Sequence, residues 1–135
     1  MRRLFVEKNT PAALSFQGLA WLFLGVPSAD SRLYHEEWQE MVQKHPGQCR
    51  VDYALSREMT NAAGGRMYVQ DSLELHSEEI LARMAAGAHF YVCGLRAMLP
   101  GIISMFERVC AKNGLVWADM LKQWKDSGQW HVEVY

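Results

Sequence analysis

The sequence predicts an α/β protein with a doubly wound parallel sheet flanked by helices, a Rossmann-like arrangement. Short apolar runs alternate with segments of helical periodicity along the chain, and this alternation is typical of parallel sheets with helices on both faces. The run at residues 18–25 is continuously apolar and rich in aromatics, as expected for a strand buried on both faces. With 135 residues and 50% hydrophobic content, the chain is expected to form one domain with a sizeable core.

The first half of the chain is expected to hold two strands with a helix between them. Residues 1–9 suit the end of an amphipathic helix, and residues 18–25 form the first strand. Asp30 or Ser31 can then cap a helix that ends near residue 44. The apolar residues at helical spacing, which predict its buried side, are Leu33, Tyr34, Trp38 and Met41. The second strand, at residues 49–55, alternates apolar and polar residues.

The second half is expected to hold three helices and two strands. Asp71 and Glu74 resemble a capping box at the start of a helix that ends at Gly87. A strand follows at residues 89–93, and Pro100 can occupy an early turn of the next helix. Another helix is predicted at residues 117–125, and a final strand reaches the last residue, Tyr135.

Composition argues against several functional classes. The net charge of −1 comes from interspersed acidic and basic residues, so bulk attraction to nucleic acid or to an anionic membrane is not expected. No apolar run reaches the roughly 20 residues of a membrane span. Cys49, Cys93 and Cys110 are an odd number at wide spacings, which favours reduced thiols over a disulfide framework. The histidines lack paired ligand spacing, so no metal site is assigned: His35, His45, His76, His89 and His131.

The polar segment from Ser56 to Gln70 follows the second predicted strand and carries the first functional hypothesis. It contains two guanidinium groups, a hydroxyl and a phenol, on Arg57, Arg66, Ser56 and Tyr68. A guanidinium fork matches a phosphate dianion, and a phenol ring offers a flat face to a purine. An adenosine with a 2′-phosphate needs this combination, which makes NADP the candidate ligand. The alternative is a solvated loop whose charges face water.

Two further segments are expected at the same edge of the sheet as Ser56 and Arg57. Gly25-Val26-Pro27 and Cys93-Gly94-Leu95 also follow strands. Ligands of open parallel sheets bind outside the carboxyl ends of the strands. The agreement of three strand ends favours a binding site over an ordinary loop.

With these residues assembled, the chain resembles the NADP-binding domain of plant-type ferredoxin–NADP reductases over essentially its whole length. The resemblance rests on several blocks in the right order: residues 18–27, 52–61, 67–68, 93–95 and 129–135. The family passes electrons from reduced ferredoxin to FAD and then a hydride from the flavin to NADP. The resemblance therefore implies an oxidoreductase.

The resemblance implies two groups of site residues. Ser56, Arg57, Arg66 and Tyr68, with Gln70 as a weaker member, would hold the 2′-phosphate and adenine, although relatives commonly carry lysine where this chain has Arg66. The pyrophosphate and ribose path would be lined by Val26 and Pro27, and the route toward the nicotinamide by Gly94 and Leu95. Cys93 and Glu133 would lie beside the nicotinamide, and Tyr135 would stack on the flavin until nicotinamide displaces it. From the residues alone, Cys93 equally suits a small core position, and Glu133 the exposed face of a strand.

The resemblance also implies groups that this sequence lacks. The chain has no FAD-binding barrel and begins after the family's first strand and its glycine-rich loop, so residues 1–135 are expected to be an N-terminally truncated NADP-binding domain that is inactive without a FAD domain. The implied partners are ferredoxin, NADP(H) and that FAD domain. Lys122 and Lys125 lie where ferredoxin would dock, but Asp126 replaces one of a usual basic pair. The plant-type ending suggests the chloroplast stroma or thylakoid surface, or a cyanobacterial cytoplasm.

Two other functions remain open from the sequence. The chain could be a non-catalytic nucleotide-binding or interaction module, or a doubly wound domain with a different anionic ligand. Restoration of activity by a FAD domain distinguishes the first alternative from the reductase, and indifference to the 2′-phosphate would support the second.

Overall fold

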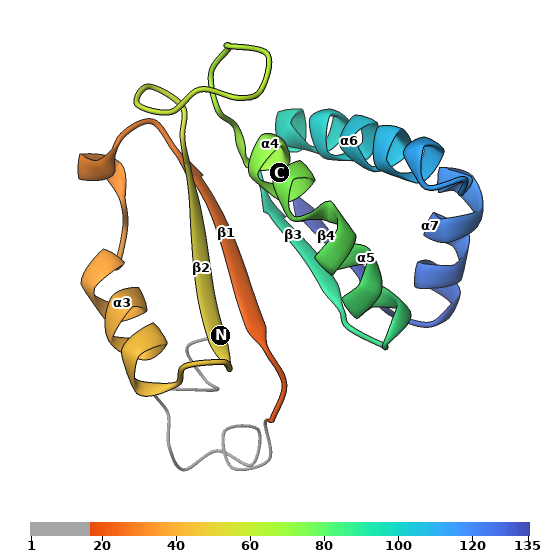
Figure 1. The fold of residues 1–135 in the computed structure, drawn as a ribbon, viewed down its shortest axis with the longest axis horizontal. Helices are drawn as coiled ribbons and strands as arrows, with labels where there is room; N and C mark the ends of the chain where they lie inside the picture. Colours follow the sequence, from red (N-terminus) through yellow and green to blue (C-terminus); the bar gives the residue numbers. More distant parts are fainter. Residues whose placement is uncertain (1–16) are drawn as a thin grey trace. The chain divides into compact units, whose positions relative to one another are not determined.

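The computed structural model describes residues 17–135, which confirm an α/β fold with parallel strands and helices (Figure 1). The expected helix at residues 1–9 lies outside the described residues. The chain divides into two compact units, Met1–Val69 and Gln70–Tyr135, which are described separately below. The described strands are hydrogen-bonded as two parallel pairs, β1 with β2 and β3 with β4. No helix in the described part of the chain is both long and apolar enough to cross a membrane.

The first unit contains β1 (Ala20–Val26), η1 (Ala29–Ser31), α3 (His35–Lys44) and β2 (Cys49–Leu55). The register of the strand pair runs from Ala20 opposite Cys49 to Val26 opposite Leu55. Met41 of α3 and Cys49 of β2 are buried together, and partly buried apolar residues pack against them: Ala20, Trp38 and Val42. Because the strands are parallel and in this register, both end at the same edge of the pair. Polar loops follow there.

The start of α3 differs from the sequence-based prediction. Asp30 and Ser31 form the short turn η1, and α3 begins at His35 after Tyr34, whose φ of 56° is left-handed. Leu33 and Tyr34 were expected on the buried side but are 72% and 60% exposed. The break in the backbone before α3 takes both side chains out of helical phase with Trp38 and Met41, which do face the core.

The second unit contains four helices, a short turn and two strands. These are α4 (Val69–Leu75), which starts at the boundary between the units, α5 (Ser77–Ala85), β3 (Phe90–Gly94), η2 (Arg96–Met98), α6 (Leu99–Lys112), α7 (Trp117–Asp126) and β4 (Trp130–Val134). Phe106 of α6 is 1% exposed and packs against four aromatic rings at centroid distances of 5.0–6.0 Å: Phe90, Trp117, Trp124 and Trp130. This aromatic cluster joins one face of β3 and β4 to the helices that follow β3.

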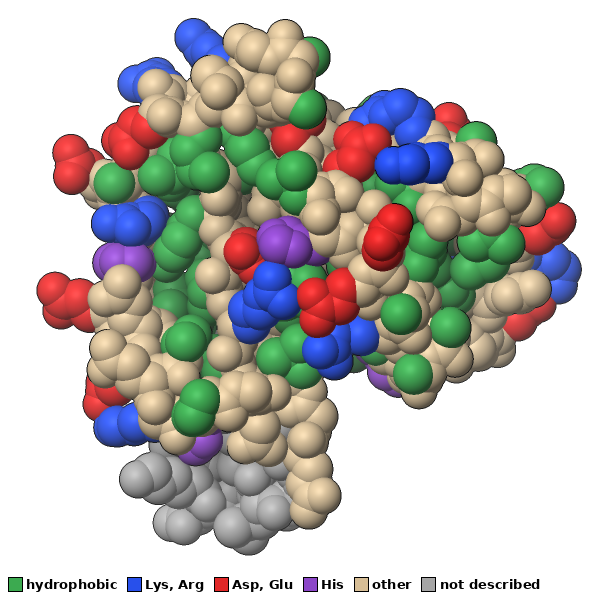
Figure 2. Space-filling view, viewed as in Figure 1, with side chains coloured by type: hydrophobic (Ala, Val, Ile, Leu, Met, Phe, Trp, Pro, Cys, Tyr) green, Lys and Arg blue, Asp and Glu red, His purple; other side chains and the backbone are tan. Residues whose placement is uncertain are grey.

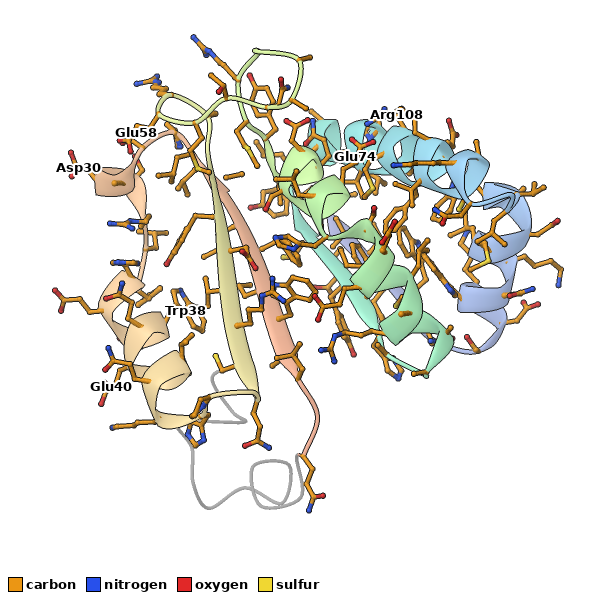
Figure 3. The ribbon with its side chains drawn as sticks, in the orientation of Figure 1. Asp30, Trp38, Glu40, Glu58, Glu74 and Arg108 are labelled. Atoms are coloured by element: carbon orange, nitrogen blue, oxygen red, sulfur yellow. The ribbon has the colours of Figure 1, made fainter. Side chains whose placement is uncertain are left out.

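The expected capping box at Asp71 and Glu74 is wrong. The helix already begins at Val69, so Asp71 lies inside its first turn. Glu74 instead forms an ion pair with Arg108 of α6 at 3.0 Å, and Figure 3 shows the two side chains side by side. The predicted single helix is also divided at His76, whose backbone leaves the helical conformation.

Candidate functional site

The carboxyl ends of β1 and β2 bring four of the expected site residues together in the first unit. Beyond the last strand residues, the amide of Ser56 donates to the carbonyl of Val26 at 3.0 Å, and the amide of Arg57 donates to the carbonyl of Pro27 at 2.8 Å. The parallel ladder thus extends into both loops. It holds Val26 and Pro27 beside Ser56 and Arg57, as expected for the edge of a sheet where ligands bind.

The loop from residue 56 to residue 68, called here the 56–68 loop, is folded back on itself. Thr60 and Arg66 form an antiparallel bridge, and the amide of Met67 donates to the carbonyl of Met59 at 3.1 Å. Met67 is only 4% exposed and anchors the end of the loop. The loop therefore offers a defined backbone from which Arg57, Arg66 and Tyr68 project.

Asn61 organises the tip of this loop and was missed by the sequence-based reasoning. Its Oδ1 accepts hydrogen bonds from the amides of Ala63 and Gly65, at 3.1 and 2.9 Å, and its Nδ2 donates to the carbonyl of Arg66 at 3.2 Å. Gly64 between them has a φ of +80°, which favours glycine. Asparagine a few residues before Gly64-Gly65 is a turn signal that could have identified this role.

The 56–68 loop presents positive charge to solvent. Figure 2 shows basic side chains, in blue, projecting from this part of the first unit. Arg57 and Arg66 are exposed, and neither side chain forms an ion pair within residues 17–135. The carboxylate of Glu58, labelled in Figure 3, instead accepts a hydrogen bond from the amide of Ala29 at 3.0 Å. The two guanidinium groups thus remain available to an anion, and Tyr68, 48% exposed, offers part of its ring.

The expected nicotinamide-side residues come together in the second unit. Parallel pairing places Cys93 of β3 directly opposite Glu133 of β4, and both are exposed. They line a surface recess of about 340 Å³ together with Tyr91, Val92, His131 and Val132. The thiol and the carboxylate therefore share one solvent-facing side of the strand pair, while Val92 on the opposite side is buried.

The backbone of the terminal residue is fixed, although its ring is not buried. The amide of Tyr135 donates to the carbonyl of Gly94 at 3.1 Å, and its carbonyl accepts from the amide of Arg96 at 2.9 Å. The side chain is 78% exposed. Tyr135 thus continues the β3–β4 ladder and presents an open aromatic face.

Gly94 and Leu95 shape the turn after β3. Gly94 has a φ of +146°, and a Cβ at this position would lie 2.8 Å from Sδ of Met98. Only glycine adopts this conformation without strain. Leu95 is 63% exposed at the start of the same turn.

Gln70 lies in α4, in the second unit, and packs against α6. Its Nε2 would be 2.9 Å from a Cβ added at Gly101. The local contact of Gln70 is therefore with the first turns of α6, whereas the other expected adenosine-side residues belong to the first unit.

The other two thiols have structural positions. Cys49 and Cys110 are 3% and 0% exposed, and burial raises the pKa of each thiol above its ordinary value of 9.0. Both therefore stay protonated near neutral pH and act as small core residues. Cys93 is the exposed cysteine.

Comparison with known families gives a match to the family described as Oxidoreductase NAD-binding domain. The match covers residues 1–103, about three quarters of the chain. It includes the 56–68 loop and Cys93, Gly94 and Leu95.

The chain is also similar to several curated ferredoxin–NADP reductases. It is 49% identical over 134 residues to the chloroplastic enzyme of Chlamydomonas reinhardtii, covering 99% of this chain and 37% of the relative. It is 50% identical over 135 residues both to the chloroplastic embryo isozyme of Oryza sativa subsp. japonica and to the chloroplastic root isozyme 2 of Arabidopsis thaliana. Each of these matches covers all of this chain and 35% of the relative. The chain thus spans slightly more than a third of the length of these relatives.

Proposed function

Because this chain belongs to the family of oxidoreductase NAD-binding domains, we propose that it is the NADP-binding part of a ferredoxin–NADP reductase. The observation that carries the proposal is the 56–68 loop, which holds two exposed arginines and a hydroxyl beside the end of β1. Fixed positive charge at this edge suits the 2′-phosphate that distinguishes NADP from NAD.

In this proposal the first unit binds the adenosine end of NADP. Arg57 and Arg66 form charge-assisted hydrogen bonds with the 2′-phosphate, and Ser56 donates its hydroxyl. Tyr68 stacks on the adenine. Val26 and Pro27, tied to Ser56 and Arg57 through the backbone, line the path of the pyrophosphate and ribose. Gln70 is a weaker contributor.

The second unit then positions the nicotinamide. Cys93 and Glu133, opposite each other on adjacent strands, contact the ring and fix its orientation, and Cys93 acts by position and not as a nucleophile. Gly94 and Leu95, in the turn after β3, line the route toward the nicotinamide. The exposed carboxylate of Glu133 also places a hydrogen-bonding group and a negative charge near the reacting ring.

The residues present fit a flavin contact as well. Tyr135 has an anchored backbone and a ring that is 78% exposed, which suits stacking against a flat cofactor. FAD, held by a separate domain of the intact protein, supplies the electron and hydride transfer. Residues 1–135 act as the NADP-binding domain of that protein.

We extend the proposal to the partner and compartment of the intact protein. Reduced ferredoxin is the electron donor, and the names of the relatives favour the chloroplast. A basic surface for ferredoxin is weakened at α7, because Lys122 is paired with Asp126 at 2.6 Å. Lys125 on the same helix is exposed.

Calorimetric titrations with 2′-phospho-AMP and with AMP test the nucleotide assignment. Arg57→Ala and Arg66→Ala should each weaken binding of 2′-phospho-AMP by about tenfold to a hundredfold, since a hydrogen bond to a charged group contributes about 1.5–3 kcal/mol. Binding of AMP should change by less than about threefold, because each 1.4 kcal/mol is tenfold in affinity and AMP lacks the phosphate concerned. Arg83→Ala is the matched control, since Arg83 is already paired with Glu79 at 2.9 Å. Equal losses for both nucleotides would contradict the assignment.

Reconstitution tests the reductase assignment. The chain would be joined to the remaining part of the Chlamydomonas reinhardtii relative, and reduction of an artificial electron acceptor by NADPH would be measured. We expect activity that falls in Cys93→Ser and Tyr135→Ala variants with FAD still bound. An assembled, FAD-loaded protein that is inactive would instead support a non-catalytic nucleotide-binding module.

A further inference from the structure

We propose that His89 and His131 form a two-histidine site for a divalent transition-metal ion, with Zn²⁺ as the probe. Nδ1 of His89 and Nε2 of His131 lie 3.1 Å apart, although the residues are 42 positions apart in sequence. Parallel pairing of β3 with β4 produces this contact, so the spacing of histidines along the sequence gave no sign of it. Imidazole nitrogen is a preferred ligand of zinc, copper and nickel.

The separation of the two nitrogens fits bidentate binding. With metal–nitrogen bonds of about 2.05 Å, a nitrogen separation of 3.1 Å corresponds to a nitrogen–metal–nitrogen angle of about 98°. A regular tetrahedral site needs a separation of about 3.3 Å at the same bond length. The nitrogens therefore need to separate by about 0.2 Å for ideal tetrahedral geometry. Because the rings face each other through these nitrogens, with centroids 5.4 Å apart and planes 21° from parallel, each ring must also turn by roughly 40° to direct its lone pair at a shared ion.

The backbone around both histidines is fixed before any metal arrives. Gln129 accepts a hydrogen bond from the amide of Phe90 at 2.8 Å through its carbonyl, and its Nε2 donates to the carbonyl of Ala88 at 2.7 Å. The residues on both sides of His89 are thus tied to the residue that precedes β4. His131 lies inside β4, and its ring stacks on Tyr91 at 4.3 Å and 10°. Such preorganisation lowers the entropy lost when a ligand binds.

The surroundings can complete the coordination of the metal with water. His131 borders the recess of about 340 Å³ that Cys93 and Glu133 also line. Glu133 lies two positions beyond His131 on the same face of the strand, about 7 Å along it, so its negative charge favours a cation nearby. The described residues contain no group of three or more metal-ligating side chains, and the proposed site therefore has two protein ligands.

Metal binding requires a proton to change position but not to leave. In the metal-free pair one ring nitrogen donates the hydrogen bond and the other accepts it. Each neutral imidazole offers the metal its unprotonated nitrogen, so the donating ring must move its proton to its remote nitrogen. No redox step is involved, and the bound waters supply the other ligands.

Calorimetry with Zn²⁺ on the full chain at pH 7.5, with a non-chelating reductant, tests the site. We expect one ion per chain, with an affinity reduced more than tenfold in His89→Gln and in His131→Gln. His35→Gln is the matched control, because His35 also hydrogen-bonds through Nδ1 but to the hydroxyl of Tyr53, at 2.9 Å, and it should bind zinc as the parent does. Cys93→Ser should also leave the affinity unchanged.

Long-range nitrogen NMR of the unsubstituted chain provides a second test that does not depend on how the variants fold. Zinc should shift the signals of Nδ1 of His89 and Nε2 of His131 together and fix the protons of both rings on the remote nitrogens. Absence of these shifts at millimolar zinc would overturn the proposal. So would full affinity in either histidine variant, or loss of binding in Cys93→Ser.

Discussion

Replacing Asn61 by alanine tests whether the shape of the 56–68 loop, and not its charge alone, selects the ligand. The substitution removes three hydrogen bonds of 2.9–3.2 Å to the loop backbone and leaves Arg57 and Arg66 in place. An exposed hydrogen bond contributes a net ~0.5–1 kcal/mol, so the folded loop should lose about 1.5–3 kcal/mol.

If the loop must be ordered to bind, this loss of loop stability lowers the affinity for the nucleotide by the same free energy. Since each 1.4 kcal/mol is a factor of ten, binding of 2′-phospho-AMP should weaken by about tenfold to a hundredfold, the upper limit applying if the loop becomes largely disordered. Binding of AMP should change much less. Calorimetric titration measures both, and faster amide hydrogen exchange at Ala63 and Gly65 would report the loosened loop.

Asn113→Ala is the control for the Asn61 variant. Asn113 also bonds to the backbone, through Nδ2 to the carbonyl of Val109 at 2.8 Å, but at the end of α6 in the second unit. It should lower global stability slightly and leave the preference for 2′-phospho-AMP unchanged. If Asn61→Ala bound 2′-phospho-AMP as tightly as the parent chain, the proposed role of the loop backbone would be refuted.

Three further predictions concern the second unit. Gly94→Ala should weaken NADP⁺ binding in calorimetry, because any residue other than glycine is strained at a φ of +146° and the turn must change conformation. Unchanged affinity would argue against this turn as the nicotinamide route. Phe106→Ala should lower the free energy of unfolding in urea by about 3–5 kcal/mol, the usual cost of a buried aromatic, and a loss below about 1 kcal/mol would contradict its central place in the core. Burial raises the pKa of the Cys110 thiol in the folded chain above its ordinary value of 9.0. Above pH 9.0 the folded state therefore keeps a proton that the unfolded state releases. The contribution of this thiol to the free energy of unfolding should be constant below pH 9.0 and be lost as the pH rises through the pKa of the folded-state thiol. In Cys110→Ala the urea midpoint should fall less steeply above pH 9.0 than in the parent, and identical slopes would count against this explanation.

The strands and the residues at their ends could be predicted from the sequence because local signals were strong. The apolar run that became β1 indicated a buried strand. The glycine and proline near its end indicated a turn. The hydroxyl of Ser56 and the charge of Arg57, directly after β2, predicted that both residues lie at the ligand-binding edge of the sheet. Backbone hydrogen bonds do join them to Val26 and Pro27.

Other features depended on contacts that local sequence does not encode. Leu33 and Tyr34 fit the apolar spacing of a helix, but the left-handed backbone of Tyr34 interrupts the helical geometry before α3. The two side chains therefore do not lie on the buried side of that helix. The spacing of Asp71 and Glu74 suggested a capping box, but Glu74 forms an ion pair with Arg108 instead. The contact between His89 and His131 needed the register of two strands separated by a whole pair of helices.

Asn61 shows a different limit. Its signal was present, because an asparagine shortly before two glycines is typical of a turn. The charged groups of the 56–68 loop predicted its ligand but did not indicate which residue shapes its backbone. The groups that contact a ligand could thus be named from their chemistry, whereas the residues that position them required the hydrogen-bond pattern.

The most direct test of the central claim is an amide NMR titration of this chain with 2′-phospho-AMP and, separately, with AMP. The phosphorylated ligand should shift the amides of the 56–68 loop, with the largest changes near Arg57, Arg66 and Tyr68, at concentrations where AMP shifts them little. A folded chain whose loop responds equally to both ligands, or to neither, would contradict the assignment of this loop to the 2′-phosphate of NADP.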